Sequence, residues 1–73
     1  MVKWWITLGH ESNETWEKYE RLAKLAFKYD IWCLPKIGIY GSDRQLEMYL
    51  SSKSYLKLFK FKMAMAKDEE GEL

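Results

Sequence analysis

Residues 2 to 8 alternate strictly between two kinds of side chain. One set is Val2, Trp4, Ile6 and Leu8, and the other is Lys3, Trp5 and Thr7. Neighbours along a strand point to opposite faces of its sheet, so the alternation predicts a half-buried β-strand. When Trp4 points into the core, Trp5 therefore points outward. A large aromatic ring on the outer face of the sheet needs an explanation in a chain of 73 residues.

A helix is predicted to follow the turn at residues 9–11 and to run to about Tyr29. Ser12 or Asn13 can cap its first turn, and Glu14 complements the helix dipole. Three pairs place an acidic residue four positions before a basic one, which stabilises an exposed helix face. The apolar side of this helix is expected to contain Trp16, Tyr19, Leu22, Ala23, Ala26 and Phe27.

The segment 31–40 has two interpretations. Apolar runs at 31–34 and 37–40 flank Pro35-Lys36, which predicts two short strands around a turn. Proline cannot adopt the positive φ that tight hairpin turns require, so this turn would be wider than two residues. The alternative is one strand that is broken at Pro35.

A second helix and a last strand are predicted for the rest of the chain. Ser42 followed by Gln45 has the spacing of a capping box, which indicates a short helix over 42–50 with Leu46, Tyr49 and Leu50 on its buried side. Residues 55–65 alternate and predict a strand. Its two faces would be Phe59, Phe61, Met63 and Met65 on one side, and Lys60 and Lys62 on the other.

The predicted order is strand, helix, strand, strand, helix, strand. This βαββαβ order is that of ferredoxin-like α+β sandwiches, in which two helices pack on one face of an antiparallel sheet. With residues 31–40 as one strand, a three-stranded βαβαβ variant results. We expect one α+β domain over 1–67 and an acidic, disordered tail over 68–73.

The face of the sheet away from the helices is the predicted binding surface. An open antiparallel face is normally polar, whereas this one is expected to combine large rings with lysines. Its expected residues are Lys3, Trp5, Thr7, Trp32, Tyr40, Lys60 and Lys62. Three hypotheses follow: the face binds protein, as a homodimer or as an inhibitor or adaptor of another protein; it stacks single-stranded nucleic acid on Trp5 and Tyr40; or the C-terminal segment covers it as ordinary core.

Charge favours the first of these hypotheses. The formal net charge is only +1, with ten lysines and two arginines, although the chain without its acidic tail carries +5. A strongly basic protein would have favoured nucleic acid, and base-specific recognition relies mainly on arginine. Small chains of this kind are frequent in viruses and mobile elements, where many block a host protein. That expectation rests on size alone.

Catalysis, cofactors and metals are not expected. Cys33, the only cysteine, lies in an apolar run and is expected to be a small buried hydrophobe. His10 lacks a second ligand at a recognisable spacing, and two helix caps explain the serines near it better than an anion site does. No glycine-rich phosphate loop or nucleophile motif is present. No apolar run is long enough for a membrane span or a signal peptide, so we expect a cytoplasmic protein.

Overall fold

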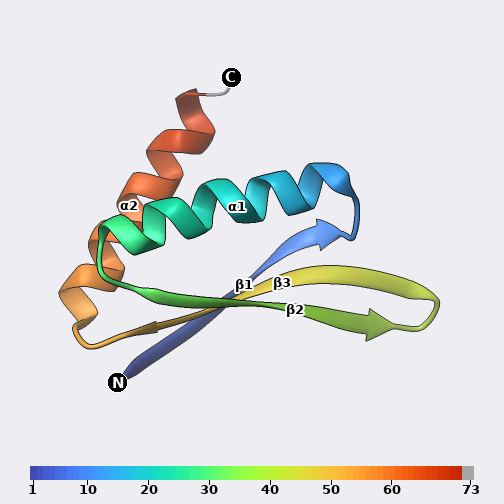
Figure 1. Cartoon of the computed structure of the whole chain (residues 1–73), viewed down its shortest axis with the longest axis horizontal. Coiled ribbons are helices and arrows are strands. Elements are labelled where there is room, and N and C mark those ends of the chain that lie inside the picture. The colour runs from blue at the N-terminus through green and yellow to red at the C-terminus, as the bar shows by residue number, and fades with distance from the viewer. Residues whose placement is uncertain (72–73) are drawn as a thin grey trace.

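The chain folds into a three-stranded sheet with two helices. The computed structural model describes the backbone of residues 1–71 and the side chains of residues 1–67. The elements are β1 (Val2–His10), α1 (Asn13–Lys28), β2 (Trp32–Tyr40), β3 (Asp43–Ser52) and α2 (Tyr55–Gly71), shown in Figure 1. The α+β class and the antiparallel sheet are confirmed, but the order βαββα is neither the predicted βαββαβ nor its βαβαβ variant.

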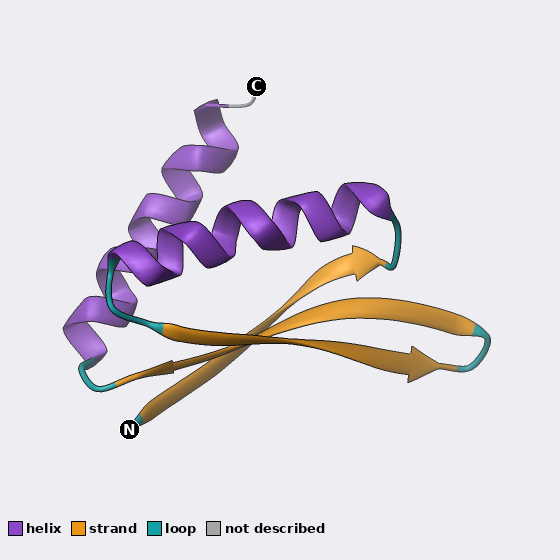
Figure 2. Cartoon of the chain, viewed as in Figure 1, coloured by secondary structure: helices purple, strands orange, loops and turns teal. Residues whose placement is uncertain are grey.

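The sheet has β3 at its centre, in the order β1-β3-β2, and both pairings are antiparallel. Both helices lie on the same side of this sheet, and no described element lies on the other side (Figure 2). The hydrophobic core lies between the two layers. It combines Leu22 and Ala26 of α1, Ile31 just before β2, Met48 and Leu50 of β3, and Leu58 and Phe61 of α2.

The first strand and the first helix agree with the sequence pattern. Val2, Trp4, Ile6 and Leu8 pack against the core from β1, and Trp5 is 53% exposed. Ser12 caps α1 reciprocally: its Oγ accepts from the Thr15 backbone N–H at 3.3 Å, and Thr15 Oγ1 accepts from the Ser12 N–H at 2.9 Å. Phe27 is the exception, because it lies outside the core with 85% of its surface exposed.

The predicted helix over 42–50 is wrong. This segment is β3, and its alternation places Leu46, Met48 and Leu50 in the core. A tight turn joins it to β2, since Tyr40 pairs directly with Asp43. Gly41 adopts a φ of +67°, the positive value that favours glycine at the first position of such a hairpin. The predicted Ser42–Gln45 capping box is therefore part of a hairpin.

The predicted strand over 55–65 is also wrong, because α2 covers these residues. Leu58 and Phe61 face the core three positions apart, as one side of a helix requires, whereas Phe59 is 49% exposed. The chain therefore has no fourth strand among its described residues. The predicted acidic tail, 68–73, falls where side chains are not described, and residues 72–73 lie outside the described residues altogether.

Segment 31–40 forms one continuous strand from Trp32 to Tyr40 rather than a hairpin. It runs through Pro35, which has no backbone N–H to donate to a neighbouring strand; a central strand has neighbours on both sides, whereas an edge strand has one open side. The sheet order makes β2 an edge strand, where proline is tolerated.

Candidate binding surface on the open sheet face

The register of the sheet arranges the open face in rows that cross β1, β3 and β2. Each row has one residue from each strand, and paired residues of a sheet face the same side. The first row is Lys3, Ser51 and Trp32; the middle row is Trp5, Tyr49 and Leu34; the third row is Thr7, Glu47 and Lys36. We call these nine residues the open-face patch.

The middle row is an exposed apolar band across the whole sheet. The rings of Trp5 and Tyr49 stack with centroids 6.4 Å apart and planes 23° apart. Leu34 is 51% exposed beside them, and Trp32 of the first row is 71% exposed. Together these four side chains line a shallow hollow of about 450 Å³. Contiguous apolar surface of this kind usually marks an interaction site.

A buried carboxylate lies next to this band. Glu47 is only 4% exposed although it is on the open side of the central strand. The Tyr40 hydroxyl donates to Glu47 Oε2 at 3.3 Å, and the negative charge of Glu47 is the main reason why the pKa of Tyr40 is raised. Gly38 makes room for this contact, because a Cβ there would lie 2.5 Å from Glu47 Oε1 and 2.8 Å from the Tyr40 ring.

The lysines of the face also contact its rings. Lys36 Nζ lies 5.2 Å from the centroid of the Tyr49 ring, within the range of a cation–π interaction. The patch therefore has two cations, Lys3 and Lys36, and one buried anion, Glu47. Its charge is nearly balanced, and its middle is apolar.

Five of the seven predicted residues lie on this face: Lys3, Trp5, Thr7, Trp32 and Tyr40. Lys60 and Lys62 do not, because both belong to α2 rather than to a strand. Lys62 Nζ lies 4.1 Å from the centroid of the Trp4 ring, on the helix side of the sheet. Lys60 lies beside Phe59 and Met63 at a separate shallow hollow.

Sequence reasoning missed Leu34, Lys36, Glu47 and Tyr49. Leu34 was predicted in a short strand but not assigned to the open face, Lys36 was predicted in a turn, and Glu47 and Tyr49 were predicted in a helix. The available signal was the alternation Leu46, Met48 and Leu50, which is also compatible with a strand.

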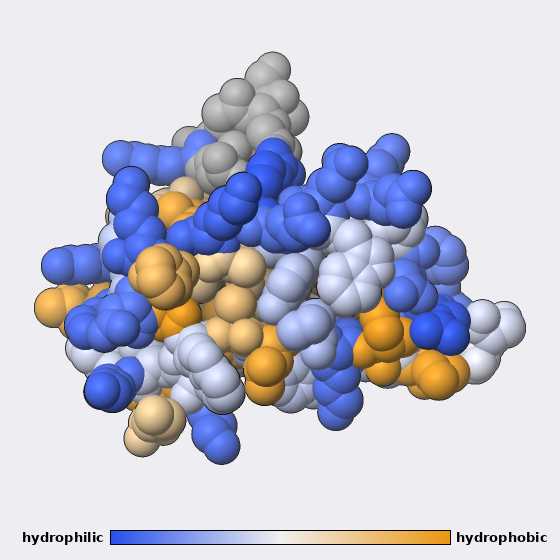
Figure 3. Space-filling view, viewed as in Figure 1, coloured by the Kyte–Doolittle hydropathy of each residue, from blue (hydrophilic) through white to orange (hydrophobic). Residues whose placement is uncertain are grey.

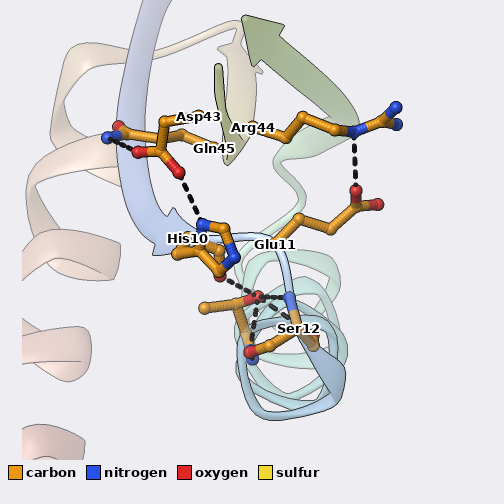
Figure 4. A network of polar contacts seen from close by, with 7 residues as sticks. His10, Glu11, Ser12, Asp43, Arg44 and Gln45 are labelled. Atoms are coloured by element: carbon orange, nitrogen blue, oxygen red, sulfur yellow. Dashed lines mark hydrogen bonds and ion pairs between the residues drawn. The ribbon is translucent and has the colours of Figure 1, made fainter. Parts of the chain in front are cut away.

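A cluster of polar side chains lies at the end of the sheet where β1 leads into α1 (Figure 4). His10 Nδ1 lies 2.5 Å from Asp43 Oδ1, and Arg44 Nε donates to Glu11 Oε1 at 3.0 Å. Hydrogen bonds from Gln45 and His10 lower the pKa of Asp43. Both bases of this cluster are thus paired with carboxylates of the chain itself, which does not favour an anion site here.

A second apolar surface follows the outer side of α2. Its residues, which we call the α2 stripe, are each about half exposed or more: Tyr55, Leu56, Phe59 and Met63. The outer side of α1, by contrast, is covered with polar side chains (Figure 3). The α2 stripe is separated from the open-face patch by the thickness of the sheet, so the two surfaces can be tested independently.

Comparison of the chain with protein-family models, with curated proteins and with solved structures found no match. Within residues 1–67, His, Cys, Asp and Glu side chains form no group of three that could hold a metal ion. Neither helix, over its described length, is long and apolar enough to cross a membrane.

Proposed function

We propose that this chain is a non-enzymatic protein-binding module that acts through its open-face patch. One observation carries the proposal: Trp5, Leu34 and Trp32 are each more than half exposed and adjoin Tyr49 on a sheet face that no described element covers. Tryptophan and tyrosine dominate the energetic centres of protein interfaces. An apolar band with charged residues at its edges also matches the composition of such interfaces.

The alternative, single-stranded nucleic acid, is less well supported. Binding of this kind needs cations that follow the phosphates, and Lys60 and Lys62 lie on α2, away from the rings. The two rings chosen for stacking are also far apart. Leu34 lies in the same row as Trp5, and Tyr40 lies six residues further along β2. Six strand residues span about 20 Å. Neighbouring bases cannot stack on both rings at that separation.

A role in binding rather than catalysis fits the polar groups near the face. Glu47 is engaged by Tyr40, and the carboxylates of Asp43 and Glu11 are engaged by His10 and Arg44. Each of these carboxylates is thus held by a partner within the chain.

Site-specific photo-cross-linking tests the proposal. A photoreactive amino acid replaces Leu34 on the open face or, as the matched control, Phe59 on the α2 stripe; the two side chains are 51% and 49% exposed. In extracts of the source cells we expect protein adducts from position 34 that Trp5→Ala suppresses. Adducts from position 59 only, or adducts from position 34 that nuclease removes, would contradict a protein-binding face.

A further inference from the structure

We infer that the protein bound by the open-face patch is a second copy of this chain. The inference rests on the proposed function and names its partner. It also specifies the geometry: the two sheets pack face to face around a two-fold axis that lies between them, perpendicular to the strands, and passes through the middle row. Each surface in a two-fold dimer must be complementary to itself, and the rows of the patch meet that condition.

Rotation about this axis exchanges the first and third rows. The middle row meets itself, so Trp5, Tyr49 and Leu34 form a continuous apolar centre with their counterparts. Ser51 then lies opposite Glu47 of the second copy. The Ser51 hydroxyl donates to the thioether of Met1 at 3.2 Å, which is a weak acceptor.

Charges also match in this arrangement. Lys3 is the neighbour of Ser51 in the first row, so its positive charge lies over the part of the second copy that contains Glu47; because Glu47 is only 4% exposed, the attraction acts without direct contact. Lys36 of the third row comes opposite Trp32 of the second copy, where it can contact the exposed ring as a cation–π pair. Each contact occurs twice, because the axis repeats it.

The other simple two-fold axis, parallel to the strands, is disfavoured by the same register. It keeps β3 on the axis, so Glu47 would lie opposite Glu47 of the second copy. Two carboxylates facing each other in a closed apolar interface repel, and the neighbouring cation, Lys36, contacts the Tyr49 ring of its own copy. The position of Glu47 on the central strand thus selects between the two geometries.

The size of the patch is sufficient for a weak dimer. Aromatic side chains bury about 150–250 Å² each, so the exposed parts of Trp5, Trp32, Tyr49 and Leu34 total about 450 Å² per copy. Two copies with their polar rows bury about 1,000–1,200 Å², the lower end of specific interfaces. A chain of 73 residues also has only a small core of its own, which a second sheet would enlarge.

Sedimentation velocity of the full chain from about 1 to 500 μM tests the inference. We expect the mass of the 8.8 kDa chain to double with concentration. Trp5→Ala should raise the dimer dissociation constant at least tenfold, whereas Phe59→Ala, on the α2 stripe, should change it less than threefold. A monomer at every concentration, or a dimer that only Phe59→Ala weakens, would overturn the inference. Circular dichroism of each variant verifies that it is folded.

Cross-linking identifies the axis. In a Cys33→Ser background, Leu34→Cys or Ser51→Cys is treated with a bismaleimide of about 10 Å, the spacing of packed sheets. Under the inferred axis, Leu34→Cys cross-links efficiently, while the two Ser51→Cys residues are about 13 Å further apart along the strands. The reverse pattern would refute this geometry. The inference and the proposed function can fail separately. A monomeric chain that still forms adducts with other proteins from position 34 overturns the dimer but not the protein-binding face.

Discussion

Two phenylalanines of α2 give the sharpest test of the fold. Phe61 is fully buried, and Phe59, two positions earlier, is 49% exposed. A strand would place both on one face, and their replacement by alanine would then have similar effects. A helix places them about 200° apart, so the effects must differ.

The expected magnitudes follow from burial. Truncation of a buried phenylalanine to alanine costs about 3–5 kcal/mol, which combines lost transfer free energy and the cavity that remains. The total stability of a domain of this size is of the order of 4–10 kcal/mol. Phe61→Ala is therefore expected to lose most of its free energy of unfolding. Phe59→Ala should stay within about 1 kcal/mol of the parent chain, partly because alanine has the higher helix propensity.

Urea denaturation monitored by circular dichroism and tryptophan fluorescence measures both variants at one low chain concentration. Phe61→Leu is a milder companion that keeps the chain folded if Phe61→Ala does not fold. Equal destabilisation by Phe59→Ala and Phe61→Ala would show that α2 is not the helix described here. A much larger effect at Phe59 would show that the wrong side of the helix has been placed in the core.

Three further predictions concern Asp30, which lies between α1 and β2, and Lys62 of α2. Asp30 has a φ of +60°, so Asp30→Gly should be tolerated better than Asp30→Ala, by about 1 kcal/mol in urea denaturation. The Lys57 ammonium, 2.9 Å away, lowers the pKa of Asp30; this stabilisation is present above the ordinary pKa of 3.8 and is lost as the pH falls through the lowered value. Melting temperatures between pH 2 and 7 should therefore fall less steeply in Asp30→Asn, and identical profiles would refute the contribution of this pair. Lys62→Ala should cost about 0.5–1 kcal/mol because it removes the contact with the Trp4 ring, and Lys62→Arg should retain most of it. Similar losses in both variants would exclude a cation–π contribution.

Only part of the open-face patch could be predicted from the sequence. Trp5 and Thr7 were placed correctly because strand alternation alone decides which way they point. Lys60 and Lys62 were assigned to the same face because 55–65 also alternates, but those lysines belong to a helix. Tyr49 and Glu47, which complete the patch, became visible only when β3 was placed between β1 and β2.

The sequence by itself determined β1 and α1. Each has a single dominant hydrophobic period, and α1 also has a local cap at Ser12, so local physical chemistry leaves one solution. The segments 42–50 and 55–65 are different, because each satisfies both a helical and a strand period. Tertiary structure decided them: the hairpin at Gly41 and pairing on both edges fix residues 43–52 as the central strand. Residues 55–65 then bury Leu58 and Phe61 against that strand and leave Phe59 in solvent, because a helix presents only one side to a sheet.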